Sequence, residues 1–123
     1  MKKFLFLAGI NGAIGVIAGA VASHSGGLAG GPAATIRLGG SYHLAHALAL
    51  GLAAFAIRGA AAPRAAAAAW LFVAGMVLFC GGLYLLALTG AHLFAYLVPF
   101  GGLSFIAGWI MLALAALKLE EPI

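Results

Sequence analysis

Residues 65–88, AAAAAWLFVAGMVLFCGGLYLLAL, form the longest apolar block of the chain and contain no charged side chain. As an α-helix this block is about 36 Å long, more than the roughly 30 Å of a bilayer's hydrocarbon core. The whole chain is 66% hydrophobic and 7% charged, too few charges to cover a soluble domain. The sequence therefore predicts an all-α integral membrane protein, a four-helix transmembrane bundle with a single domain over residues 1–123. The four predicted spans are residues 4–22, 42–57, 65–88 and 98–117.

The basic side chains lie at the edges of these blocks and predict the orientation. With four spans, the N-terminus, the connection between the second and third spans, and the C-terminus all fall on one side of the membrane. That side holds five of the six basic residues, Lys2, Lys3, Arg58, Arg64 and Lys118, and the other side holds Arg37. Because basic residues concentrate in cytoplasmic loops, both termini are predicted to be cytoplasmic. Residues 23–41, which contain three Gly-Gly pairs, are predicted to form an outward-facing loop that is irregular or partly helical.

Local signals mark the ends of the blocks. Ala20-Val21-Ala22 has the layout of a signal-peptide cleavage site, but the remainder is itself a membrane domain, so we expect the first block to be a retained span. Pro63 predicts a tight turn over residues 58–64, and Thr89-Gly90 predicts a helix end. Pro99 suits the first turn of the last helix. Residues 91–97 have the aromatic composition of an interfacial segment.

Small residues are expected to hold the helices together, since lipid tails are as apolar as leucine and burial of leucine gains little there. The first span carries a Gly-x-x-x-Gly motif, and the second carries Ala47-x-x-x-Gly51. These residues predict either a tight monomeric bundle, the interpretation that we favour, or an interface with another chain. The predicted packing glycines are Gly12, Gly15, Gly19, Gly51, Gly81, Gly82, Gly101, Gly102 and Gly108.

Polar side chains within the spans are expensive in a bilayer and so are candidates for function. They are Asn11, His43, His46, Cys80, Tyr84 and Ser104. His43 and His46 are one helical turn apart and share a face, where they could bind a metal or haem or relay protons. We favour a structural interpretation, with His43 at the headgroup interface and His46 bonded to a backbone carbonyl. His24 could approach them, so the candidate functional cluster is His24, Tyr42, His43 and His46.

Several function classes lack the residues they need. The two carboxylates, Glu120 and Glu121, lie in the C-terminal tail, so the spans offer no acidic group for proton-coupled export. No nucleophile has a base beside it, and no phosphate-binding loop is present, so we expect a protein that is not an enzyme. A single cysteine, Cys80, is too few for a cysteine-based zinc site. Basic residues are scattered, which argues against nucleic-acid binding. We expect no cofactor and no metal.

Motifs along nearly the whole chain resemble a bacterial membrane family catalogued as domain of unknown function 423, or transmembrane protein 256-like. Gly19-Ala20 with His24 resembles its Gly-Ala-x-x-x-His element, and Tyr42 with 46–50 resembles its Tyr-x-x-x-His-Ala-Leu-Ala-Leu. The longest pieces are residues 79–90, FCGGLYLLALTG, and Pro99-Phe100-Gly101-Gly102 with Gly108-Trp109. The family usually has serines in the third span where this chain has Cys80 and Gly82. The resemblance implies a four-span bacterial inner-membrane protein of unassigned activity, and it points to His24, Tyr42, His46, Tyr84, Pro99 and Trp109.

Three hypotheses about function follow. The first is an accessory or scaffold subunit of a larger membrane complex, with the bilayer and other membrane subunits, or further copies of the chain, as partners. The second is an oligomeric pore or carrier for a small solute or ion, with the histidines near its outer mouth. The third and weakest is a quinone, haem or metal site on His24, His43 and His46.

Overall fold

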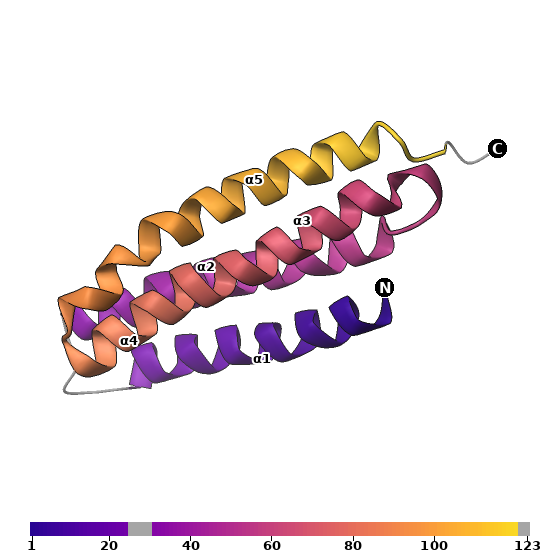
Figure 1. Cartoon of the computed structure of the whole chain (residues 1–123). Helices are drawn as coiled ribbons and strands as arrows, with labels where there is room; N and C mark the ends of the chain where they lie inside the picture. Colours follow the sequence, from indigo (N-terminus) through magenta and orange to yellow (C-terminus); the bar gives the residue numbers. More distant parts are fainter. Residues whose placement is uncertain (25–30, 121–123) are drawn as a thin grey trace.

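The protein is a bundle of long antiparallel helices, seen here in a computed structural model that describes residues 1–24 and 31–120 (Figure 1). The first two helices are α1 (Lys2–His24) and α2 (Gly31–Phe55). A third rod runs from Gly59 to Thr89 through η1 (Gly59–Ala61), α3 (Ala62–Gly75), the π-helical η2 (Met76–Cys80) and α4 (Gly81–Thr89). The last rod consists of η3 (His92–Tyr96) and α5 (Val98–Ala116). No strand occurs among these residues, so the all-α prediction is confirmed.

Three helical segments of the described chain are long and apolar enough to cross a membrane: Lys2–His24, Gly59–Thr89 and His92–Ala116. The helix α2 has 25 residues but is not among them. It carries Arg37, two histidines and four glycines, which lower its mean hydropathy. It is also the central helix, because 11 of its residues are buried, compared with four in α1. Its two histidines lie on the buried side of α2, which can keep polar side chains that a lipid-facing side could not.

The predicted loop over residues 23–41 was placed wrongly, and so was the start of the second helix at Tyr42. Ser23 and His24 end α1, α2 begins at Gly31, and residues 25–30 lie outside the described chain. The glycines that suggested a loop make close helix contacts instead. A Cβ on Gly39 would lie 2.8 Å from the Tyr84 ring, and one on Gly40 would lie 3.2 Å from the Ala18 Cβ. Tertiary packing thus outweighs the weak helix propensity of glycine.

The predicted turn over residues 58–64 is shorter than expected. Arg58 is extended, Gly59 takes φ +52°, and α3 already begins at Ala62, with Pro63 in its first turn. Proline fits there because the first N–H groups of a helix have no partner within the helix. The helix end at Thr89 and the position of Pro99 agree with the sequence signals, and Gly90 takes the left-handed conformation with φ 70°.

The N-terminus, the turn between α2 and α3, and the C-terminal end of α5 lie at the same end of the bundle (Figure 1). That end therefore carries five of the six Lys and Arg residues, whereas Arg37 lies near the start of α2 at the other end. Arg64 donates to the Leu114 carbonyl over 3.1 Å, near the last turn of α5. A guanidinium at a helix C-terminus satisfies carbonyls that have no partner within the helix.

Alanine and glycine dominate the core. The largest buried cluster contains six alanines of α2 and α3 together with six larger side chains, which are Phe4, Leu50, Phe72, Met76, Cys80 and Phe105. Small residues allow the backbones of α2 and α3 to approach closely, which strengthens dispersion contacts in a lipid environment. The polar side chains of α2 lie along this core, so the packing of the bundle decides what each of them can contact.

Candidate functional site

His43 joins three helices through its two ring nitrogens. Its Nε2 lies 2.7 Å from Asn11 Oδ1 on α1, and its Nδ1 lies 3.0 Å from the Tyr84 hydroxyl on α4. The Asn11 amide nitrogen donates to the Leu7 carbonyl over 2.8 Å, which leaves its oxygen as the acceptor for His43. The proton of His43 is therefore on Nε2, and Nδ1 accepts from Tyr84. All three polar groups are satisfied within the bundle.

His46 has the opposite tautomer. Its Nδ1 lies 2.7 Å from the Tyr42 carbonyl, which can only accept, and Trp109 Nε1, which can only donate, lies 3.1 Å from its Nε2. The proton is therefore on Nδ1, and Nε2 accepts from the indole. Phe105 stacks on the imidazole at 3.6 Å between centroids, and the Tyr42 ring lies nearly parallel to it with centroids 5.9 Å apart.

The two histidines share a helix but not a network. His43 is 5% exposed and bonds toward α1 and α4, whereas His46 is 6% exposed and bonds toward α5. The structural interpretation of His46 as a donor to a backbone carbonyl agrees with its bond to Tyr42. The interfacial position expected for His43 is wrong, because His43 is buried between helices. Helix packing outweighs the local polarity of this segment.

His24 does not join the other members of the predicted cluster. It is exposed at the end of α1, 13 residues beyond Asn11, which is about 20 Å along the helix axis. Asn11 is the α1 residue that lies beside His43. Tyr42 contributes its carbonyl to His46, and its ring packs on Phe79 at 4.6 Å. The structure thus keeps Tyr42 with His46 and separates His24 from both histidines.

Asn11, Tyr84 and Trp109 complete the site, although none belonged to the predicted cluster. The signal for Asn11 and Tyr84 was their polarity within apolar spans, and Trp109 stood out in the family resemblance. Sequence spacing could not pair them, because they come from α1, α4 and α5. A further polar contact joins α5 to α3, since the Ser104 hydroxyl donates to the Leu71 carbonyl over 2.6 Å.

The described residues contain no group of three or more His, Cys, Asp and Glu side chains placed to hold a metal ion. Cys80 is a free thiol, fully buried in the core. A metal or haem iron binds an unprotonated imidazole nitrogen. The two such nitrogens of the buried histidines, Nδ1 of His43 and Nε2 of His46, already accept from Tyr84 and Trp109.

The predicted packing glycines fall into two groups. A Cβ at Gly15, Gly82 or Gly108 would lie 2.7 to 3.1 Å from a neighbouring helix or segment, and one at Gly101 would collide with the Phe79 backbone. By contrast, a Cβ at Gly19 or Gly51 would meet nothing within 4 Å, and those at the remaining three, Gly12, Gly81 and Gly102, would make ordinary contacts. Three close approaches were not predicted: Gly39 and Gly40, described above, and Gly75, which packs against the Phe105 ring.

Comparison with known proteins finds a family and several full-length relatives. The profile of a family described as a protein of unknown function, DUF423, matches residues 18–102. The chain is 39% identical to the UPF0382 membrane protein YwdK of Bacillus subtilis, covering 96% of this chain and 98% of that protein. It is 35% identical to the UPF0382 membrane protein SAB0533 of Staphylococcus aureus, with the same coverage.

A shorter match, 47% identical over 47 residues, covers 38% of this chain and 36% of the UPF0382 inner membrane protein YgdD of Escherichia coli. No solved structure matches the chain. The family match covers more than half of the sequence, and the similarity to the Bacillus protein runs from end to end. This confirms the resemblance that the motifs predict: the chain belongs to the DUF423 family, whose relatives are named as membrane proteins.

Proposed function

We propose that this chain is a four-span inner-membrane protein without catalytic activity, an accessory subunit of a larger membrane complex, with both termini in the cytoplasm. The observation that carries this proposal is that the buried histidines bond only to groups of the bundle itself. Every ring nitrogen of His43 and His46 is used in a bond within the bundle. A general base or a metal ligand needs a lone pair that can face its substrate or metal.

The buried polar groups act as cross-links between helices. His43 connects α2 to α1 and α4, His46 connects α2 to α5, and Ser104 connects α5 to α3. Hydrogen bonds between membrane helices contribute about 0.6 kcal/mol each on average, and up to about 1.7 kcal/mol. A set of such bonds gives a small bundle one defined arrangement. This arrangement suits a subunit that presents a constant surface to its neighbours.

The four-span arrangement is supported by helix length and by the distribution of charge. The helix α2 lies within the bundle and is about 37 Å long, enough to cross the hydrocarbon core beside the other three rods. Five basic residues at the end that holds both termini favour a cytoplasmic location for that end. The relative from Escherichia coli is named an inner membrane protein, which supports the same membrane for this chain.

The outer surface offers apolar side chains on every rod. One strongly exposed residue from each rod is 64–69% accessible, and the four are Phe6, Leu48, Val77 and Leu103. In a bilayer these side chains face lipid or the helices of a partner. Their similar exposure makes them a matched set of positions for mapping what lies beside each rod.

The proposal is tested by placing a photo-cross-linking residue at each of these four positions in the chain at its native expression level. Protein cross-links that come from one or two rods, together with a co-purifying subunit in native mass spectrometry, are expected. A clean monomer in mild detergent, with lipid as the only cross-linked species at all four positions, would overturn the accessory role.

Flux measurements in liposomes separate this role from the pore or carrier alternative. We expect background flux for the purified chain and for His46→Ala alike. Solute or ion flux that depends on His46 would overturn the proposal in favour of a carrier. Absorption spectra and metal analysis of the same preparation test for a quinone, haem or metal, and a stoichiometric group would likewise contradict it.

A further inference from the structure

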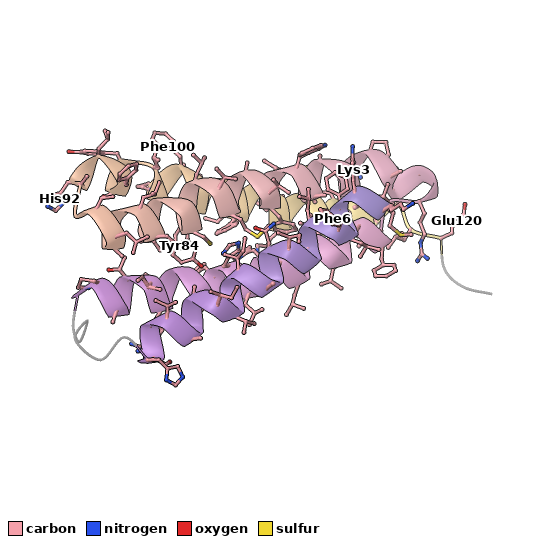
Figure 2. The ribbon with its side chains drawn as sticks, turned by 90° about the horizontal axis from the view of Figure 1, so that it is seen from below. Lys3, Phe6, Tyr84, His92, Phe100 and Glu120 are labelled. Carbon is pink, nitrogen blue, oxygen red and sulfur yellow. The ribbon has the colours of Figure 1, made fainter. Side chains whose placement is uncertain are left out.

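An apolar groove opens on the side of the bundle, between the second half of α1 and α4, with α2 beneath. Its volume is about 280 Å³, and it is lined by Ile14, Ile17, Ala18, Val21, Ile36, Tyr84 and Leu88. Figure 2 shows Tyr84 extending from α4 toward the pair of helices α1 and α2. The groove exists because the main packing partner of α1 is α2, so that α1 and α4 remain apart.

The size of the groove suits a hydrocarbon chain. Its lining residues Ile14 and Val21 are seven residues apart, or about 10 Å along α1. Carbon atoms pack at about 4 Å, so a single hydrocarbon chain is about 4–5 Å wide. A groove of about 280 Å³ along this length therefore has room for one such chain.

The chemistry of the walls agrees with this occupant. Six of the seven lining residues are aliphatic, and the hydroxyl of the seventh, Tyr84, is hydrogen-bonded to His43. Filling the groove with hydrocarbon therefore leaves no polar group of the wall unpaired. Ile17 and Leu88 stand on opposite walls and are 59% and 72% exposed, so a lipid chain can enter sideways from the bilayer.

A cation lies close to one end of the groove. The Arg37 guanidinium is 3.4 Å from the carbonyl of Ala22, the residue that follows the groove-lining Val21. This bond uses one of the five N–H donors of arginine, and the side chain is exposed. Arg37 is the single Lys or Arg at this end of the bundle, where the positive-inside rule disfavours one. Arginine binds phosphate through paired, charge-assisted hydrogen bonds.

We propose that the groove between α1, α2 and α4 holds one acyl chain of an anionic phospholipid, whose phosphate binds Arg37. A zwitterionic phospholipid carries its own amine, which competes with Arg37 for the phosphate, so an anionic headgroup is preferred. This proposal requires α1 and α4 to lie in the bilayer but is independent of the accessory role. A result that overturns one of these two proposals leaves the other unaffected.

The test uses the purified full chain in mild detergent, titrated with phosphatidylglycerol or phosphatidylethanolamine and followed by native mass spectrometry. One tightly held phosphatidylglycerol per chain is expected, with weaker binding of phosphatidylethanolamine. Ile17→Trp and Leu88→Trp fill the groove from opposite walls, and each should lower lipid affinity about tenfold. Val16→Trp is the matched control, because Val16 is 60% exposed on α1 but does not line the groove.

Arg37→Gln tests the headgroup contact separately. It should abolish the preference for phosphatidylglycerol over phosphatidylethanolamine, while Arg37→Lys retains part of it. Circular dichroism shows which variants fold, and the two tryptophan variants on opposite walls provide independent tests. Equal lipid binding by Ile17→Trp, Leu88→Trp and Val16→Trp overturns the groove as the site. An unchanged lipid preference in Arg37→Gln overturns the phosphate contact.

Discussion

The indole of Trp109 on α5 donates a hydrogen bond to Nε2 of His46 on α2 over 3.1 Å. Because His46 donates its own proton to the Tyr42 carbonyl, this bond requires neutral His46 in a single tautomer. The Phe105 ring stacks on the same imidazole at 3.6 Å. These side chains connect α5 to the central helix, and their removal is the most direct test of the bundle.

Trp109→Phe should lower the free energy of unfolding by about 1 kcal/mol, because His46 loses its donor while most of the ring packing is kept. Reversible unfolding in mixed micelles measures this change. Trp70→Phe is the control, since it makes the same substitution at a half-exposed tryptophan that takes no part in this hydrogen bond. Equal stability of Trp109→Phe and the unmodified chain would show that the bond contributes nothing.

Asn11→Leu should lower the free energy of unfolding by about 1–3 kcal/mol, because it leaves the Nε2 proton of His43 buried without its acceptor. The double variant Asn11→Leu with His43→Leu removes both partners and should be less destabilised than the sum of the two single variants. A double-mutant cycle of unfolding free energies gives the coupling. Strict additivity would mean that the two side chains do not interact.

Gly101→Ala should destabilise the bundle by about 1–3 kcal/mol, because its Cβ would collide with the backbone of Phe79 and force α5 away. Gly51→Ala provides the matched control, since a Cβ there meets nothing within 4 Å, and should be neutral or slightly stabilising. Thermal unfolding in detergent compares the two variants. The packing argument fails if both alanine variants behave alike.

The orientation can be tested with reporter fusions. A fluorescent protein joined after residue 123 should fold and fluoresce, because we expect the C-terminus in the cytoplasm. An alkaline phosphatase joined after Gly90, between α4 and α5, should be active, since that connection lies at the opposite end of the bundle. Active phosphatase at the C-terminus together with inactive phosphatase at Gly90 would reverse the predicted topology.

Much of the fold could be predicted from the sequence, because its signals are local. Long apolar blocks specify helices suited to a bilayer, Gly90 supplies the left-handed residue that ends α4, and Pro99 suits the first turn of α5. Where prediction failed, a local signal competed with packing. Gly39 and Gly40 predicted a loop, yet they lie within α2 because their missing side chains admit Tyr84 and Ala18. The π-helical turn Met76–Cys80 had no signal that we recognise.

The candidate site shows the same division. By itself the sequence determined which polar residues lie within apolar spans and that His43 and His46 share one helical face. Only the tertiary structure decided that His43 pairs with Asn11 and Tyr84 while His46 pairs with Trp109. The physical reason is that helix periodicity determines only the face of its own helix on which a side chain lies. The residue that it contacts on another helix depends on which helices pack together and at what register. The same packing leaves α1 and α4 apart and so creates the groove beside Tyr84.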